Sequence, residues 1–275
     1  MERPKIRGLA RREFLVGGLA LTVAGTLPWR RGPSAWGMAG QEGEARGPDS
    51  EPGMRHLPRV AAPRTAPTGS VVPVVVSLGH PMETGHHIEA IEILNYDDPV
   101  VSKGRFHLTP ANGEAYLSTQ VRMSEGDSSL AVLANCSQHG EWRTSQPITV
   151  LSEGCATAGE GRENNEIGQP ILRFPEPIAR DKVVKVQVKF RHPSRTGLEK
   201  RGAGFLQVKP PFYLKTMEVY YAEERVSLYE MTSALSDTPF ITFKLHLTQE
   251  APLRVVFTNS EGHRYAVEEA LKFCC

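Results

Sequence analysis

The stretch VVPVVVSL, residues 71–78, is the first part of the chain that is suited to a folded core, and it predicts a β-strand. Its β-branched residues favour an extended backbone, and Gly69 and Gly79 bound it on either side. An equivalent run, VVKVQVKF at residues 183–190, opens a second series of strands. In FITFKLHL, residues 240–247, apolar and polar residues alternate, as in a strand with one buried face. Both series therefore indicate β-sheet structure.

Further short apolar runs follow each of these strands at close spacing. In the first series they span residues 88–94, 106–109, 115–123, 130–136 and 146–151. In the second series they span residues 204–208, 214–221, 224–229, 240–248, 253–258 and 264–267. Asn112-Gly113 lies between two runs of the first series, and this dipeptide is a strong hairpin signal. We expect an all-β chain of two immunoglobulin-like antiparallel β-sandwich domains joined by a flexible linker.

The two strand series share two landmarks in the same order. HPMETG at residues 80–85 matches HPSRTG at 192–197 in four positions, and each follows a Val-rich run. LAVLANCS at residues 130–137 parallels LRVVFTNS at 253–260. Turn residues recur by chance, but two landmarks in one order predict two domains of one fold.

The N-terminus has the layout of a twin-arginine export signal. Arg11-Arg12 precedes an uncharged apolar run at residues 16–27, which is too short to span a bilayer. A small-x-small pattern at residues 37–39 suggests cleavage after residue 39. The remaining chain holds 25 basic and 29 acidic residues, and no basic patch indicates nucleic-acid binding. We expect a periplasmic protein that does not contact the membrane after signal removal.

The composition divides the rest of the chain. Residues 40–67 are rich in Gly, Pro, Arg and Glu and are expected to form a disordered leader. The first sandwich is assigned to residues 68–155, the linker to 156–176 and the second sandwich to 177–275.

One cysteine lies between the two domains, in LSEGCATAGEG at residues 151–161. Gly154 and the other small residues around Cys155 do not build a core, so we expect an exposed, mobile arm. A thiol on such an arm could enter the active site of another protein; the alternative is a linker that contains a cysteine incidentally. The negative charges of Glu153 and Glu160 disfavour the thiolate form of Cys155. Such a thiol is better suited to a carrier that partner enzymes activate than to a catalytic nucleophile.

Other potential ligands are interpreted as structural residues. Three histidines lie in one short segment: His80, His86 and His87. Adjacent histidines on an extended chain point to opposite faces, so a shared ion would need ligands from elsewhere. Cys136 and His139 suggest a copper site, but no methionine follows. We therefore expect surface-loop histidines, a packed Cys136, no metal and no cofactor. Cys274-Cys275 are interpreted as tail thiols or as links between chains.

The order of these motifs resembles a known pair of families. From about residue 71 to 155 the chain resembles SoxY, the sulfur-carrying subunit of the thiosulfate-oxidising Sox system. The matching features are the Val-rich first strand, FHLTPANG at 106–113, the strand at 132–134 and Gly154-Cys155. From about residue 177 to 267 it resembles SoxZ, through the strand at 182–190, the HP motif at 192–193 with Thr196-Gly197, and the turn at 259–265.

The resemblance implies a SoxY–SoxZ fusion of two immunoglobulin-like sandwiches whose halves pack on each other. By position, Cys155 is the thiol that carries sulfur intermediates, and Gly154 gives the arm flexibility. The implied partners are periplasmic enzymes: a c-type cytochrome, a sulfate-releasing hydrolase and a sulfane dehydrogenase, or a quinoprotein dehydrogenase. The arm departs from the family pattern, because Glu153 and Ala156-Thr157 replace glycines and the arm is tethered at both ends. The alternative function is a non-covalent binding or adaptor module for a periplasmic dehydrogenase.

Overall fold

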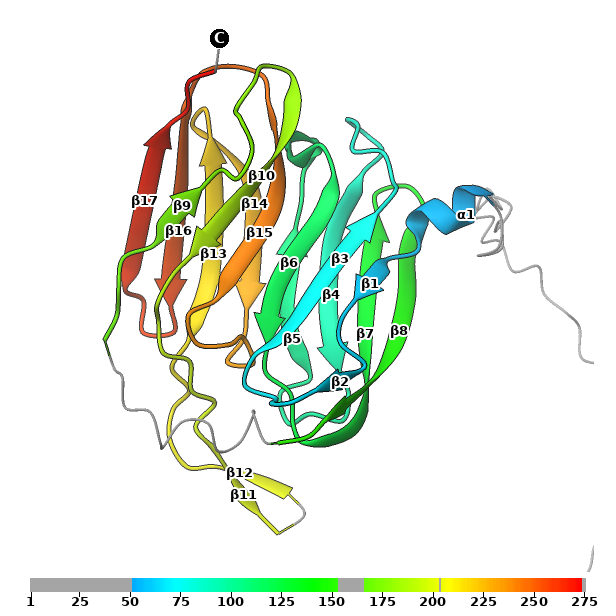
Figure 1. Cartoon of the computed structure of the whole chain (residues 1–275), viewed down its shortest axis with the longest axis vertical. Helices are drawn as coiled ribbons and strands as arrows, with labels where there is room; N and C mark the ends of the chain where they lie inside the picture. The colour runs from blue at the N-terminus through cyan, green and yellow to red at the C-terminus, as the bar shows by residue number, and fades with distance from the viewer. Residues whose placement is uncertain (1–50, 153–165, 203, 274–275) are drawn as a thin grey trace, which may run out of the picture. The chain divides into compact units, whose positions relative to one another are not determined.

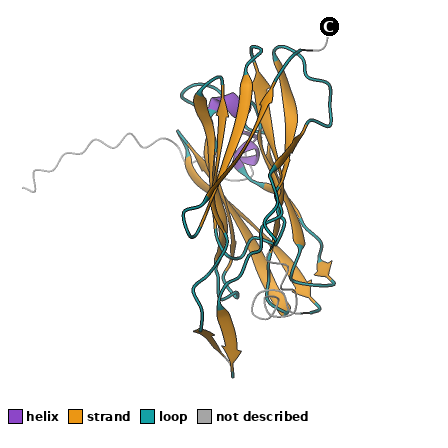
Figure 2. Cartoon of the chain, turned by 90° about the vertical axis from the view of Figure 1, so that its left-hand side faces the viewer, coloured by secondary structure: helices purple, strands orange, loops and turns teal. Residues whose placement is uncertain are grey.

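The computed structural model describes residues 51–152, 166–202 and 204–273, all within one compact unit. Two β-sheets form two layers (Figures 1 and 2). The six-stranded sheet has the order β1 (Arg59–Ala61), β3 (Val72–Leu78), β6 (Ala115–Val121), β15 (Phe240–Leu247), β10 (Lys182–Lys189) and β9 (Ile171–Arg173). The nine-stranded sheet has the order β17 (Arg264–Ala270), β16 (Pro252–Asn259), β13 (Leu214–Tyr221), β14 (Glu224–Met231), β5 (Ser102–His107), β4 (Ile88–Asn95), β7 (Gly126–Cys136), β8 (Gly140–Val150) and β2 (Thr65–Ala66). The remaining elements are α1 (Glu51–His56), the 3-10 helix η1 (Pro110–Asn112) and the hairpin of β11 (Leu198–Arg201) and β12 (Gly204–Gln207).

The two halves of the chain share both sheets. Strand β6 of the first half pairs with β15 of the second, and β5 pairs with β14. Outward from these junctions the order β6-β3 mirrors β15-β10, and β5-β4-β7-β8 mirrors β14-β13-β16-β17. This mirrored order supports the predicted repeat of one fold. The all-β prediction is confirmed. In addition to the covalent linker, strand pairing joins the two halves edge to edge.

The apolar faces of the strands pack into one core that crosses the junction. Along β3, Val72, Val74, Val76 and Leu78 are buried while the residues between them are partly or fully exposed. At the junction, Tyr229 of the second half makes edge-on ring contacts with Phe106 (5.1 Å between centroids) and Phe243 (5.9 Å). Full burial of side chains of this size contributes roughly 1.5–3 kcal/mol each. Burial of these rings therefore adds to the strand pairing that joins the halves.

The predicted hairpin at Asn112-Gly113 is wrong, because β5 and β6 belong to different sheets. The connection contains η1, and Gly113 follows it with a positive φ of 71°. The Asn112 side chain donates hydrogen bonds to Ser227 Oγ (2.9 Å) and to the Lys244 carbonyl (3.0 Å), both in the second half. Asn112 and Gly113, which favour a tight turn, thus lie in a connection between the two sheets, and Asn112 hydrogen-bonds the first half to the second.

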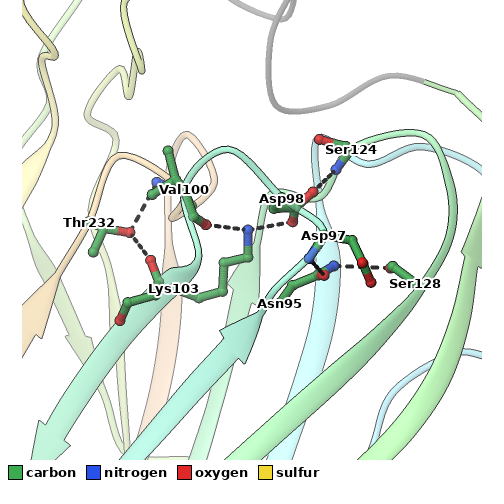
Figure 3. Close-up of polar contacts among 10 residues, drawn as sticks. Asn95, Asp97, Asp98, Val100, Lys103, Ser124, Ser128 and Thr232 are labelled. Carbon is green, nitrogen blue, oxygen red and sulfur yellow. Dashed lines mark hydrogen bonds and ion pairs between the residues drawn. The ribbon is translucent and has the colours of Figure 1, made fainter. Parts of the chain in front are cut away.

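A buried ion pair fixes the connection between β4 and β5 (Figure 3). Lys103 Nζ donates to Asp98 Oδ2 at 2.5 Å and to the Val100 carbonyl at 2.9 Å. Asp98 Oδ1 accepts the Ser124 amide at 2.7 Å, so each charge has further partners. Thr232 of the second half donates to the carbonyl of Ser102, next to this pair. Since a buried charge is costly unless it is paired and hydrogen-bonded, this arrangement specifies one conformation of the loop.

Two predicted boundaries need correction. The composition predicts a disordered leader up to residue 67, but residues 51–67 contain helix α1 and the strands β1 and β2, and the two strands extend existing sheets at their edges. The predicted linker extends to residue 176, but residues 171–173 form β9 beside β10. Both errors have one cause: these segments are held by backbone hydrogen bonds to strands distant in sequence, for which composition gives no signal. Residues 1–50, including the proposed signal, lie outside the described residues. In the described ranges no helix is long and apolar enough to cross a bilayer.

Candidate functional site

Five potential metal ligands meet at one end of the first half. Their ligand atoms all lie within 4.8 Å of one another, and the residues are His56, His80, His86, Cys136 and His139. His56 is the last residue of α1, His80 and His86 come from the β3–β4 connection, and Cys136 ends β7. We call this group the His–Cys cluster. The sandwich brings its members together because the β3–β4 and β7–β8 connections lie at the same end.

The separations in the cluster suit one metal ion. Cys136 Sγ lies 3.4 Å from His80 Nε2 and 3.5 Å from His139 Nδ1, and His56 Nε2 lies 3.1 Å from the same His139 atom. Metal bonds to histidine nitrogen and cysteine sulfur are about 2.0–2.3 Å long. Ligands at right angles around one ion are then about 3 Å apart, and opposite ligands are about 4.3 Å apart. The cluster therefore has the dimensions of one coordination sphere.

The clearest sign that the cluster fits a metal is an unsatisfied atom. His86 Nε2 is buried and has no hydrogen-bond partner. A buried polar atom without a partner carries a desolvation cost of roughly 1–3 kcal/mol. A metal ion bound by this nitrogen would remove that cost. Imidazole and thiolate ligands together suit zinc, copper, iron or nickel, whereas calcium and magnesium prefer oxygen.

His80 is prepared to ligate at neutral pH. Burial, with smaller contributions from the neighbouring imidazoles, lowers its pKa from 6.5 to about 4, so the ring is neutral. Its Nδ1–H donates to the Pro81 carbonyl at 2.6 Å. This bond leaves the Nε2 lone pair directed to the side where Cys136 Sγ lies. A backbone carbonyl that fixes the tautomer of a histidine is the usual outer support of a metal ligand.

His56 is held in place by aromatic contacts. Its ring stacks on Trp142 of β8, with centroids 4.8 Å apart and planes 23° apart, and it meets His80 and His139 edge-on. Its side chain is 6% exposed, although the neighbouring Met54 is 55% exposed. Helix α1 therefore directs its last residue into the cluster.

The sequence-based interpretation of these histidines is wrong for His80, which is buried, and His86 is half-buried. The reasoning about adjacent histidines holds, because His86 joins the cluster and His87 does not. The additional ligands that such a site needs come from His56, Cys136 and His139. Cys136 is packed at the end of its strand as expected, with 2% exposure. Sequence reasoning misses His56 because it lies in the segment predicted to be a disordered leader, and no local motif around it indicates a ligand.

The second half has a related pair without the ligands. His192 matches His80 in the repeat and Asn259 matches Cys136; Asn259 Nδ2 lies 3.5 Å from His192 Nε2. Burial lowers the pKa of His192, as it does for His80. The contact between equivalent positions is thus kept in both halves, but the thiol and the further histidines belong to the first half.

The predicted carrier residues Gly154 and Cys155 lie outside the described residues, as do Cys274 and Cys275. The structure describes the chain up to Leu151 and Ser152, which follow β8 and are exposed. Because β8 begins beside the cluster, its eleven residues place Leu151 and Ser152, at the far end of the strand, about 30 Å from the cluster.

The fold defines the chain as two related β-sandwich halves joined edge to edge, with a thiol-bearing segment between them. The chain belongs to the sulfur oxidation families: residues 54–155 match the sulfur oxidation protein SoxY and residues 172–270 match the sulphur oxidation protein SoxZ. Both halves of a fused SoxY–SoxZ protein are therefore present, as the resemblance implied, and these families support a role in sulfur-oxidation carriage.

Part of the chain is also similar to another group of proteins. It is 30% identical over 115 residues to a Thermotoga maritima protein described as a putative superoxide reductase, covering 35% of this chain and 87% of that protein. Among solved structures, a variant of superoxide reductase (neelaredoxin) from Ignicoccus hospitalis is 27% identical, with 39% of this chain and 90% of that chain covered and a TM-score of 0.35. The crystal structure of the Thermotoga maritima protein gives 30% identity, coverages of 35% and 86%, and a TM-score of 0.31.

Proposed function

We propose that the protein is a periplasmic sulfur carrier that holds sulfur intermediates covalently on Cys155. The observation that carries this proposal is that the match to SoxY ends at residue 155, five residues after the last strand of that half. The exposed Leu151 and Ser152 lead out of the sheet at this point. Export through residues 1–39 would deliver the chain to the periplasm.

In the proposed cycle the Cys155 thiol loses a proton and forms a disulfide bond with the terminal sulfur of thiosulfate. This oxidation releases two electrons, which a c-type cytochrome accepts. Other periplasmic enzymes then remove sulfate from the bound group by hydrolysis and oxidise the remaining sulfur. Covalent attachment makes each transfer effectively intramolecular and keeps the reactive sulfur out of solution. In this cycle the carrier itself catalyses no reaction.

The test is the intact mass of protein purified from its native periplasm, with Cys155→Ser as the variant. Sulfur-sized adducts are expected on the wild type and on a Cys274→Ser/Cys275→Ser control, and none on Cys155→Ser. Full loading of Cys155→Ser would refute the carrier assignment. A bare Cys155 under every growth condition would favour the adaptor function.

A second function is favoured by the His–Cys cluster. We propose that this cluster binds a redox metal, preferably iron, and reduces superoxide. The support is the convergence of five ligands, one of them a buried nitrogen without a partner, with similarity to a protein named for this activity. Five ligands exceed the four of a structural zinc site, and zinc does not change its oxidation state.

The residues of the chain would have distinct tasks in this reaction. Cys136 and the four histidines hold the metal, and Pro81 and Trp142 keep His80 and His56 oriented. His139 is exposed, so small molecules can reach this side of the cluster from solvent. A redox metal held by these residues would supply the one-electron reduction of superoxide, which with two protons gives hydrogen peroxide, and an external one-electron donor would complete the cycle.

Metal content and superoxide consumption of His86→Ala test this second function, with His87→Ala as the matched control. His87 is adjacent in sequence but outside the cluster. We expect one iron per chain and superoxide consumption in the wild type and in His87→Ala, and a loss of at least about tenfold in iron affinity in His86→Ala. Equal iron affinity in both variants would contradict the site.

A further inference from the structure

The segment that supplies His56 also reaches the residues before Cys155. Residues 56–69, which we call the N-terminal strap, begin at the His–Cys cluster and include β1 and β2. In Figure 1 the blue chain runs from α1 past β3 to β2, at the opposite end of the first half. The strap therefore runs alongside β8, from the candidate metal site to the other end of the sheet.

At its far end the strap is bonded to the root of the Cys155 segment, which we define as residues 149–152. The bonds join the Thr149 amide to the Arg64 carbonyl (2.9 Å), the Leu151 amide to the Ala66 carbonyl (2.9 Å), Ser152 Oγ to the Pro67 carbonyl (2.8 Å) and the Gly69 amide to the Ser152 carbonyl (2.9 Å). Further along, Gln146 Nε2 donates to the Ala62 carbonyl at 2.7 Å. The end of β8 thus receives its outer hydrogen bonds from the strap.

The strap is a weakly held part of the sheet. Strand β1 has three residues and β2 has two, and both lie at sheet edges. Short edge elements with few buried side chains open locally at low free-energy cost. In the strap, His56, Pro58, Ala66 and Gly69 are buried, whereas the other residues are partly or fully exposed. Peeling the strap away from the sheet would carry His56 out of the cluster and expose the Thr149 and Leu151 amides together.

We propose that the N-terminal strap couples occupancy of the His–Cys cluster to the order of the root of the Cys155 segment. A metal ion bound by His56 stabilises the docked strap, because opening would then break a coordination bond as well as the backbone hydrogen bonds. The root, which receives its bonds from the strap, is stabilised to the same extent. Metal occupancy thereby changes the stability of the root, which lies about 30 Å from the cluster and precedes the proposed carrier residue in the sequence.

Linkage makes this proposal quantitative. If docking of the strap strengthens metal binding by some factor, metal binding must strengthen docking by the same factor. This factor is measured as the ratio of the metal affinities of the wild type and of His56→Ala. The slowing of amide exchange at the root on metal saturation should equal this factor, as long as the strap opens as one unit. We expect it to be about tenfold or more, the range typical for loss of a metal-site contact.

The experiment is hydrogen–deuterium exchange of the full chain with and without saturating Fe(II) under anaerobic conditions. The readouts are the Thr149, Leu151 and Gly69 amides, with the paired Val255 and Val256 amides of β16 as an internal reference. His56→Ala is the variant, because four cluster ligands remain. Met54→Ala is the matched control in the same helix, since Met54 is exposed. Iron affinity of each protein is measured in parallel by competition with a chelator.

We expect Fe(II) to slow exchange at the root in the wild type and in Met54→Ala, and to leave it unchanged in iron-saturated His56→Ala. Bound iron with unchanged exchange in the wild type would overturn the coupling while leaving the metal site intact. Equal slowing in iron-saturated His56→Ala would overturn it as well, because the strap would not be the route. Absence of iron binding by the wild type would remove the metal site, on which this inference rests, and the inference with it.

Discussion

Replacing Cys136 by alanine separates the packing role of this residue from its role as a metal ligand. The thiol is 2% exposed at the end of β7 and contacts His80 and His139. In the metal-free protein Cys136→Ala removes one buried sulfur atom, which should lower the free energy of unfolding by about 1 kcal/mol. In the presence of metal the same change also removes a ligand, so the two conditions should differ strongly.

The size of the difference follows from linkage. A metal at a thousand times its Kd stabilises the folded state by about 4 kcal/mol. If loss of Cys136 weakens binding by about a hundredfold, about 2.7 kcal/mol of this stabilisation disappears. For a folded unit of this size each kcal/mol shifts Tm by roughly 2–4 °C. The wild type should thus gain about 8–16 °C on addition of metal, and the variant about 3–6 °C.

The assay is calorimetric melting of both proteins, with and without Fe(II), under anaerobic conditions and at matched concentrations. His263→Ala serves as the control, because His263 is exposed and distant in sequence from the cluster. An equal gain in Tm for the wild type and for Cys136→Ala would refute the role of Cys136 as a ligand. A large loss of stability in the metal-free variant would show instead that packing dominates.

Three further predictions concern the fold. Lys103→Met leaves the Asp98 carboxylate buried without its partner and should cost about 3–5 kcal/mol in urea unfolding, whereas adding Asp98→Asn should recover part of this; a further loss in the double variant would contradict the pairing. Gly113→Ala should cost at least about 2 kcal/mol, since φ is 71° and a Cβ would lie 2.6 Å from Val183 Cγ2; an unchanged urea midpoint would show that the junction adapts. Burial lowers the pKa of His192, so the unfolded state takes up a proton first as pH falls below about 6.5 and the free energy of unfolding decreases. Urea titrations at pH 7.5 and 5.5 should show a smaller decrease for His192→Gln, and an identical decrease would exclude this contribution.

The local pattern of the sequence was sufficient for the class of fold. The alternation along residues 72–78 and 240–247 depends on neighbouring side chains only, because successive residues of a strand face opposite sides. The repeated HP and LAVLANCS-type landmarks likewise predicted two copies of one fold, and the mirrored strand order agrees with them. The cysteine between the domains and the SoxY–SoxZ order were also evident from the linear chain.

The sites that depend on distant contacts were decided by the tertiary structure. His56 and His139 are 83 positions apart, and His80 and Cys136 are 56 positions apart, yet their ligand atoms lie within 3.1–3.4 Å. No short-range pattern contains such a meeting, because it depends on which loops end at the same end of the sandwich. The strap is a similar case: its edge strands are held by backbone hydrogen bonds, which any sequence can make, so its composition resembled that of a disordered leader. Sequence thus determined the strands and the repeat, while the pairing of distant strands decided where histidine, cysteine and strap converge.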